Sequence, residues 1–385
     1  MDQSPGRRLQ LEAYLGGAPD LPWSFAGWEA RAREKLSPER FDYIYGSAGD
    51  ERTCRANLEA FDRVRLVPRM LGENPVRELA VEVLGTRSPA PFLLAPIGVQ
   101  SVAHPEAELA TARAARATGI PFLLSTVSQF SIESVAEAAG DHPRWFQLYW
   151  ITDDEVARSF VERAEKAGYS AIVVTLDTLT IGWRPRDLEH GWLPFLHGEG
   201  IANFTSDPVM RAKHGEAMDD PGQAGPLSVL TFTNLGLGWQ DLRRVREWTK
   251  LPLLVKGVLS PEDARRAVDA GVDGVVVSNH GGRQVDGAVA SLDAFPSIRD
   301  AVGGKVRLLV DSGIRTGADV LKAMALGADA VLLGRPYVYG LGVAGEDGVR
   351  RVIDLFLADI DTTLALIGAR SVHDLDEAWL QTTPR

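Results

Sequence analysis

His280 stands in the segment SNHGGR, directly after a short apolar run, where an imidazole could act as a base. An imidazole has an unperturbed pKa of roughly 6.5, so it can accept a proton near neutrality. A carboxylate beside the ring would orient it and stabilise the imidazolium. Asp177 follows another apolar run and is our candidate for that partner. A single buried histidine is more often structural, so His280 needs support from its neighbours.

Arginines close to both residues predict a clamp for a carboxylate. Arg283 follows His280 by three residues, and Arg184 stands in GWRPRD soon after Asp177. Guanidinium groups bind carboxylates through two parallel hydrogen bonds. Arg184, or Arg186 in the same segment, could equally be a solvated surface charge. A base together with two arginines suits an anionic acid whose neighbouring carbon carries a removable proton.

Two glycine-containing segments predict a phosphate site. The first is DSGIR, with Asp311, Gly313 and Arg315, and the second is Gly334 followed by Arg335. Barrel enzymes commonly bind phosphate at such places through glycine backbone amides and an arginine. The helix expected directly after DSGIR could add the positive end of its dipole. The pattern predicts a phosphorylated ligand without saying which one.

Polar or glycine residues also stand near the carboxyl ends of the other apolar runs or directly after them, and each has a structural alternative. Lys256 by itself would more often be a salt-bridge partner, and Tyr149 a core residue whose hydroxyl is hydrogen-bonded. Their occurrence after every run nevertheless indicates one shared polar site. The further members are Ile97, Gly98, Ser125, Gln147, Thr175 and Ser278.

Eight short apolar runs, each followed by a helical pattern, must bring these residues together. We expect strands at 91–96, 121–125, 145–150, 171–176, 252–256, 274–278, 306–311 and 328–333. Runs without polar alternation are typical of parallel strands that are covered on both faces. Eight strand–helix units predict an α/β fold, a (β/α)8 TIM barrel, with its active site at the carboxyl ends of the strands.

The predicted barrel occupies residues 91–385, and residues 1–90 are expected to form an N-terminal helical extension. Pro105 and Pro261 stand at the expected first positions of two helices. The fourth and fifth strands are separated by an insertion at about 187–239, which contains many Gly, Pro, Asp and His residues. Long insertions in compact domains are often functional lids. We therefore expect this segment to cover the active site.

Composition and charge argue against several classes of protein. The chain has 41 basic and 52 acidic residues, a net charge of −11, which disfavours binding to nucleic acid or anionic membranes. Cys54 is the single cysteine, and no paired Cys/His spacing indicates a metal site. The sequence has neither a signal-peptide core nor an apolar run near the ~20 residues that span a bilayer. We expect a soluble cytoplasmic protein without a metal.

The segments SNHGGRQVDGAVASLDAFPSI and DSGIRTGADVLKAMALGADAVLLGRP resemble the FMN-dependent 2-hydroxy acid oxidases and dehydrogenases. The resemblance continues through LAPIGVQSVAHPEAELATARAA, FQLYW, VVTLDT and FDYIYGSAGDE, and it covers nearly the whole chain. It implies FMN as the cofactor, a small 2-hydroxy acid and molecular oxygen as reactants, and His280 as the catalytic base. The flavin follows from the resemblance alone, because composition and spacing predict only a phosphate-binding barrel.

The resemblance also implies a role for each residue that follows a strand. Lys256 would lie by flavin N1 and stabilise the anionic reduced ring, with Ile97 and Gly98 under the ring face. Ser125, Gln147, Thr175 and Ser278 would lie along the isoalloxazine, and Asp311, Gly313, Arg315, Gly334 and Arg335 would hold the ribityl chain and phosphate. Tyr43, Tyr149, Arg184 and Arg283 would surround the substrate, with Asp177 paired to His280.

Within that family, GWRPRDL and the insertion with its ANFTSDPVM segment most resemble lactate 2-monooxygenase, whereas Val285, Asp286 and Gly287 follow the pattern of the wider family. The implied reaction converts L-lactate and oxygen to acetate, carbon dioxide and water. Gly98 fits this reaction, because a residue without Cβ leaves room at the flavin face. The family is usually tetrameric or larger, so a homotetramer or larger homo-oligomer is expected.

Three other readings of the same residues remain open. A site that opens early would make the enzyme a plain oxidase, which releases the 2-keto acid and hydrogen peroxide. A phosphate-binding barrel aldolase or isomerase could use Lys256 as a Schiff-base amine. A non-catalytic flavin carrier would bind FMN without oxidising hydroxy acids, although the base and the two arginines argue against it.

Overall fold

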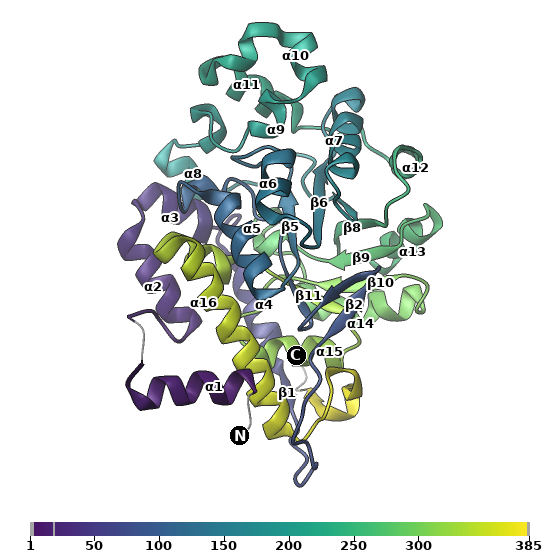
Figure 1. The fold of residues 1–385 in the computed structure, drawn as a ribbon. Helices are drawn as coiled ribbons and strands as arrows, with labels where there is room; N and C mark the ends of the chain where they lie inside the picture. Colours follow the sequence, from purple (N-terminus) through teal and green to yellow (C-terminus); the bar gives the residue numbers. More distant parts are fainter. Residues whose placement is uncertain (1–3, 18–19, 383–385) are drawn as a thin grey trace.

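The eight expected strands close into a parallel barrel in the computed structural model, which describes residues 4–17 and 20–382. The order around the barrel is β10-β11-β4-β5-β6-β7-β8-β9 (Figure 1). The strands are β4 (Phe92–Leu94), β5 (Phe122–Ser125), β6 (Arg144–Tyr149), β7 (Ile172–Thr175), β8 (Leu253–Val258), β9 (Gly274–Val277), β10 (Arg307–Val310) and β11 (Ala330–Leu333). The (β/α)8 prediction is confirmed.

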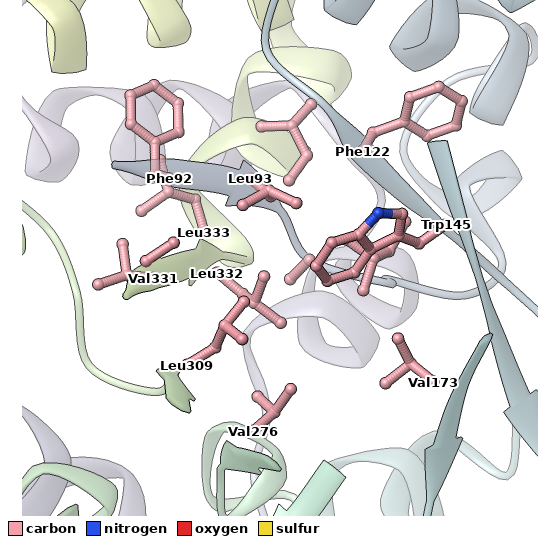
Figure 2. Packing of buried hydrophobic residues seen from close by; sticks show 14 of the residues in the cluster. Phe92, Leu93, Phe122, Trp145, Val173, Val276, Leu309, Val331, Leu332 and Leu333 are labelled. Atoms are coloured by element: carbon pink, nitrogen blue, oxygen red, sulfur yellow. The ribbon is translucent and has the colours of Figure 1, made fainter. Parts of the chain in front are cut away.

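Branched and aromatic side chains from these strands fill the barrel core. Figure 2 shows Leu93, Trp145, Val173, Val276 and Leu309 among the residues that pack there. Helices cover the outside of the barrel while side chains fill its inside, so nearly every strand residue is buried. This arrangement explains why the strands are continuous apolar runs without polar alternation. It also leaves the residues after each strand as the first that can face a polar site.

Eight helices in the described part of the chain alternate with these strands or follow the last of them. They are α5 (Ala107–Thr118), α6 (Ile132–Ala139), α7 (Asp154–Lys166), α12 (Trp239–Trp248), α13 (Pro261–Asp269), α14 (Ser291–Val302), α15 (Gly317–Ala325) and α16 (Arg335–Ile367). Helix α13 begins at Pro261 as predicted. Helix α5 begins later than predicted, at Ala107 rather than Pro105, because Ala107 has a left-handed φ of 39° that interrupts the helical path.

The insertion after β7 is built from short helices. They are α8 (Pro185–His190), α9 (Ala202–Thr205), α10 (Pro208–His214) and α11 (Pro221–Thr231), with 3₁₀ turns at Pro194–His197 and Gly215–Asp219. Asn203 fixes the insertion to the barrel: its side chain accepts from the Ile132 amide at 2.8 Å and donates to the Thr126 carbonyl at 2.9 Å. In Figure 1, α9, α10 and α11 project beyond β5 and β6 at one end of the barrel.

The residues before the barrel contain strands as well as the expected helices. The helices are α1 (Pro5–Glu12), α2 (Phe25–Lys35), α3 (Pro38–Tyr45) and α4 (Arg52–Arg63), with a π-helical turn at Ala13–Gly17. Strand β1 (Val64–Leu66) pairs with β12 (Leu380–Thr382), and β2 (Val81–Val83) pairs with β3 (Thr86–Ser88). Three-residue strands are too short to show a periodic pattern, which is why the sequence did not predict them. Within residues 4–17 and 20–382, no helix has the length and apolar character needed to cross a membrane.

Truncation of one barrel side chain should measure how much the core contributes to the stability of the fold. Leu309 in β10 is fully buried, whereas Leu366 in α16 is 69% exposed. We expect Leu309→Ala to lower the free energy of unfolding by about 2–5 kcal/mol, because it removes buried methyl groups and leaves a cavity. Leu366→Ala is the matched control and should change it by less than about 0.5 kcal/mol. Urea unfolding followed by fluorescence measures both, and equal effects would contradict this packing.

Candidate active site

One pocket lies at the carboxyl ends of the barrel strands and brings most of the predicted site residues together. Its lining includes Tyr43, Ile97, Gly98, Tyr149, Arg184, Lys256, His280, Arg283, Asp311, Gly313, Arg315, Gly334 and Arg335. The other predicted residues lie behind this wall and are hydrogen-bonded to it or to one another: Ser125, Gln147, Thr175, Asp177 and Ser278. Residues that are far apart in the sequence thus share one concave site.

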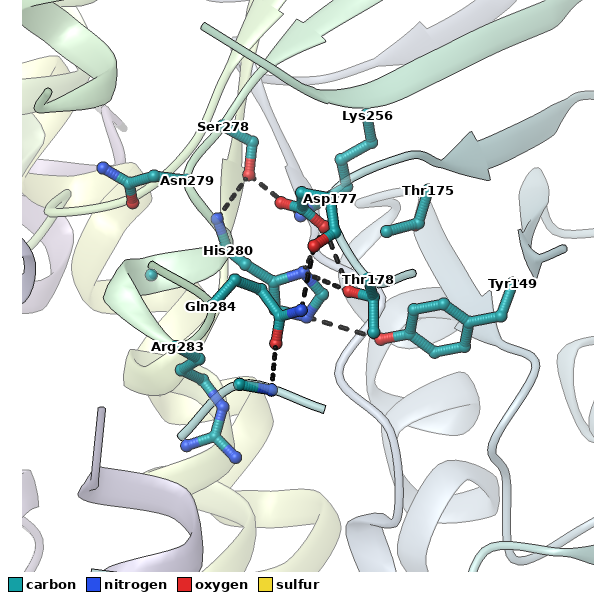
Figure 3. A network of polar contacts seen from close by, with 12 residues as sticks. Tyr149, Thr175, Asp177, Thr178, Lys256, Ser278, Asn279, His280, Arg283 and Gln284 are labelled. Atoms are coloured by element: carbon teal, nitrogen blue, oxygen red, sulfur yellow. Dashed lines mark hydrogen bonds and ion pairs between the residues drawn. The ribbon is translucent and has the colours of Figure 1, made fainter. Parts of the chain in front are cut away.

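The carboxylate of Asp177 holds the ring of His280. Asp177 Oδ1 lies 2.8 Å from His280 Nδ1, and the Thr178 hydroxyl donates to the same oxygen at 3.1 Å (Figure 3). Asp177 follows β7 and His280 follows β9, with β8 between them. Gly257 in β8 makes room for the carboxylate: a Cβ at this position would lie 2.6 Å from Asp177 Cβ. The sequence did not identify Gly257, because the glycine stands inside an apolar strand.

Burial keeps His280 in its neutral, basic form. It lowers the pKa of the imidazole below 6.5, an effect that Asp177 opposes and that the charges of Lys256 and Arg184 reinforce. Burial would raise the pKa of Asp177, but the charge and hydrogen bond of His280 hold that pKa below its usual value. With the Nδ1 proton directed to the carboxylate, Nε2 is the free acceptor. The Tyr149 hydroxyl lies 3.4 Å from Nε2.

Arg283 and Arg184 lie side by side at the same pocket. Arg283 donates to the Gly46 carbonyl at 2.6 Å, and its guanidinium carbon lies 5.3 Å from the centre of the Tyr43 ring. Arg184 Nε donates to the Arg283 carbonyl at 3.1 Å. Burial and the charge of Arg184 lower the pKa of Arg283 to about 10, so it is still charged at neutrality. Two cations that line the same pocket, with Asp187 3.8 Å from Arg184, favour an anionic ligand beside them.

Arg186, the second arginine of GWRPRD, has a different environment from Arg184. Its guanidinium donates to Glu51 at 2.7 Å and to Asp42 at 3.2 Å, and it does not line the pocket. These ion pairs explain the second arginine of GWRPRD as a structural residue. The geometry therefore selects Arg184 as the partner of Arg283.

The far end of the pocket has the donors that a phosphate needs. Arg315 lines it, and its Nε is buried without a hydrogen-bond partner among residues 4–17 and 20–382. Arg335 donates to the carbonyls of Gly281 and Gly46 at 3.1 and 3.0 Å. Gly313 has a φ of 96°, and a Cβ there would lie 2.5 Å from a backbone oxygen. Only glycine allows the backbone to take this path.

The helix after DSGIR, α15, does not offer its first amides to a phosphate as expected. The Gly317 amide at the start of α15 donates to Asp359, and the Arg315 and Thr316 amides donate to Asp319. These carboxylates already satisfy the donors, so the predicted role of this helix dipole is wrong. Helix α16 begins directly at the pocket with Arg335, and Pro336, the next residue, has no amide N–H to donate.

Polar side chains at the pocket wall and directly behind it form an edge between the two ends of the pocket. Lys256 Nζ lies 2.9 Å from Ser278 Oγ and 3.2 Å from Asp311 Oδ2. Gln147 accepts from the Ser125 hydroxyl at 3.1 Å and donates to the Thr175 hydroxyl at 2.8 Å. The edge suits hydrogen bonding to a flat heterocycle.

Together these features fit FMN. The unpartnered Arg315 Nε and the glycine backbone match a phosphate, and the polar edge matches the heterocycle. Gly98 lets the loop after β4 pack closely on the loop after β5, because a Cβ there would lie 2.3 Å from a Val127 methyl group. Other lining residues escaped the sequence analysis. Four of them are apolar residues outside any motif, so nothing in the sequence marks them: Ile181, Leu193, Phe195 and Phe232. Thr178 could have been predicted, because it directly follows Asp177 in the sequence.

Comparison with known proteins agrees with this fit. A profile of the family described as FMN-dependent dehydrogenase matches residues 32–382. The L-lactate oxidase of Lysinibacillus sphaericus is 43% identical over 367 residues, which span 95% of this chain and 94% of that protein. The 4-hydroxymandelate oxidase of Amycolatopsis orientalis is 43% identical over 351 residues, 91% of this chain and 95% of that protein.

A solved structure of mandelate oxidase with (S)-4-hydroxymandelic acid superimposes with a TM-score of 0.84 at 41% sequence identity. The match covers 94% of this chain and 99% of the other. The predicted family and its FMN cofactor are thereby confirmed, and the aldolase and flavin-carrier readings lose their support. The chain belongs to the FMN-dependent dehydrogenase family and is an enzyme that oxidises 2-hydroxy acids.

Proposed function

We propose that this enzyme oxidises L-lactate, or a similarly small L-2-hydroxy acid, with molecular oxygen as the electron acceptor. The observation that carries the proposal is the meeting of His280, Arg184 and Arg283 at one pocket, with His280 oriented by Asp177. A base beside two arginines binds and deprotonates an anionic hydroxy acid. The similarity to an L-lactate oxidase supports lactate as the first substrate to test.

The protein residues divide the work between binding and proton transfer. Arg184 and Arg283 would hold the carboxylate, with the Tyr43 hydroxyl as a further donor. His280 Nε2 would take the hydroxyl proton, and Asp177 would stabilise the imidazolium that forms. In a carbanion route His280 would take the α-proton instead, with the same residues around it. FMN, when bound, would supply the two-electron acceptor and the link to oxygen.

The shape of the pocket favours an acid with an apolar side chain. Residues of the insertion and its flanks, Ile181, Leu193, Phe195 and Phe232, contribute an apolar wall. Phe232 packs edge-on against the Tyr149 ring, with centroids 6.3 Å apart. A polar side chain on the substrate would lose its hydration there without gaining a partner. We propose that the insertion acts as the lid of the site.

We further propose that lactate leaves the enzyme as acetate. Under a closed lid, pyruvate and hydrogen peroxide would meet before either escapes, and their reaction gives acetate, carbon dioxide and water. Gly98 and the contribution of the insertion to the pocket support this outcome. The plain oxidase outcome is the second candidate, because the relative from Lysinibacillus sphaericus is named an L-lactate oxidase.

The products formed in air should separate these outcomes. We expect about one acetate per oxygen consumed from L-lactate, with little free peroxide. The ratio should be the same with excess catalase, because catalase removes only peroxide that has left the site. Pyruvate and hydrogen peroxide in equal amounts would overturn the monooxygenase proposal and leave 2-hydroxy acid oxidation intact. Absence of any anaerobic flavin bleaching by 2-hydroxy acids would overturn the function itself.

Removal of one arginine should weaken binding of the acid. We expect Arg283→Ala to raise the lactate concentration needed for half-maximal anaerobic flavin reduction by on the order of 10²-fold, because charged hydrogen bonds to the carboxylate are lost. Arg186→Ala is the matched control, since Arg186 pairs with Glu51 and Asp42 outside the pocket. An unchanged saturation curve for Arg283→Ala would count against the clamp.

A further inference from the structure

Glu108 is a buried carboxylate for which the mechanism above has no use. It lies in the first turn of α5, and its residue is 1% exposed. Oε1 accepts from the Gln100 amide at 3.0 Å, and Oε2 accepts from the Gln129 amide at 3.1 Å. Burial raises the pKa of this carboxyl to about 7. A carboxylate so costly to bury must be held by its hydrogen bonds.

The two amides belong to different loops of the active site. Gln100 lies in the loop after β4, which carries Ile97 and Gly98, and Gln129 lies in the loop after β5, which carries Val127. The Val99 amide donates to the Val127 carbonyl at 2.7 Å. Glu108 therefore bonds to both loops at the point where they already touch.

The backbone at Gly98 and Val99 has a geometry that neighbouring hydrogen bonds must hold in place. Val99 has a φ of 54°, a left-handed conformation that β-branched residues rarely adopt. The neighbouring Gly98 is packed so closely that a Cβ would lie 2.3 Å from a Val127 methyl group. Loops with such restraints keep their shape only when the surrounding bonds hold them. The bond from the Gln100 amide to Glu108 directly follows the strained residue.

The same cluster reaches the insertion. The Gly200 amide donates to Gln129 Oε1 at 3.0 Å, and the Ser101 hydroxyl donates to Glu199 at 2.8 Å. Gly200 has a φ of 77°, and a Cβ there would lie 2.7 Å from a Val99 methyl group. The insertion thus rests directly on the loop that Glu108 holds.

We propose that Glu108 is a positioning residue: its two oxygens fix the pocket wall that carries Ile97 and Gly98 and join that wall to the insertion. The inference rests on the proposed placement of FMN against these two residues. Glutamine has the same shape but only one acceptor oxygen, and its amide nitrogen would face a second N–H donor. Glu108→Gln should therefore release at least one loop without emptying any space.

Amide hydrogen exchange in the FMN-loaded enzyme at about pH 8.5, where Glu108 is ionised, directly tests whether Glu108 clamps the two loops. In Glu108→Gln we expect the Gln100 or Gln129 amide, or both, to exchange on the order of tenfold faster or more, because a charge-assisted bond is lost. FMN release on dilution, followed by flavin fluorescence, should also become about tenfold faster. Wild-type protection of both amides in a folded variant would overturn the proposal.

Asp361→Asn is the matched control, because Asp361 is another buried carboxylate, bonded to Arg77 and to the Gly6 amide outside the pocket. It should leave the exchange rates of the Gln100 and Gln129 amides and the rate of FMN release unchanged. An effect equal to that of Glu108→Gln would mean that Glu108 is only structural.

If Glu108→Gln does not fold, Glu108→Asp replaces it. The shorter carboxylate should keep one loop protected and release the other, and protection of both would overturn the clamp. Faster exchange with unchanged FMN release would support the clamp and contradict the FMN placement.

Discussion

The hydrogen bond between Asp177 and His280 is the interaction on which the rest of the site depends. It joins the ends of β7 and β9 across β8, so it can form only when these three strands have paired. Gly257 makes room for it, and the Thr178 hydroxyl adds a donor to the same carboxylate oxygen. The bond fixes the tautomer of the ring and leaves Nε2 facing the pocket. The Asp177 carboxylate therefore orients the His280 ring, so that Nε2 can accept a proton from a ligand in the pocket.

The charged side chains at the pocket explain which ligands it would bind. Arg184, Arg283, Arg315 and Arg335 are cations at the pocket; Arg184 lies 3.8 Å from Asp187, and Lys256 is paired with Asp311. An excess of buried positive charge is costly unless anions arrive to neutralise it. The carboxylate of a hydroxy acid and the phosphate of FMN are the two anions that such a site would take. The polar edge between the arginines, built on the ends of β5 to β9, matches the uncharged part of the cofactor.

Much of this arrangement could be predicted from the sequence, for reasons that the structure makes clear. All eight barrel strands were placed, because strands buried on both faces are continuous apolar runs. His280, Asp177 and Arg283 were found because each follows such a run. The helices α8, α9 and α10 of the insertion and the strands β1, β2 and β3 are too short to show a period. The use of the α15 amides by Asp359 and Asp319 is a tertiary contact with no local signal.

The central claim is that His280 acts as a buried base whose ring Asp177 holds, and the pH dependence of anaerobic flavin reduction by L-lactate tests it most directly. Burial lowers the pKa of His280, so the rate at low lactate should fall only when the pH drops below 6.5. Because the charge of Asp177 raises that pKa, Asp177→Asn should move the loss of rate to still lower pH and reduce the plateau by on the order of 10²-fold or more. Loss of rate beginning above pH 6.5, or a profile that Asp177→Asn does not move, would contradict the account.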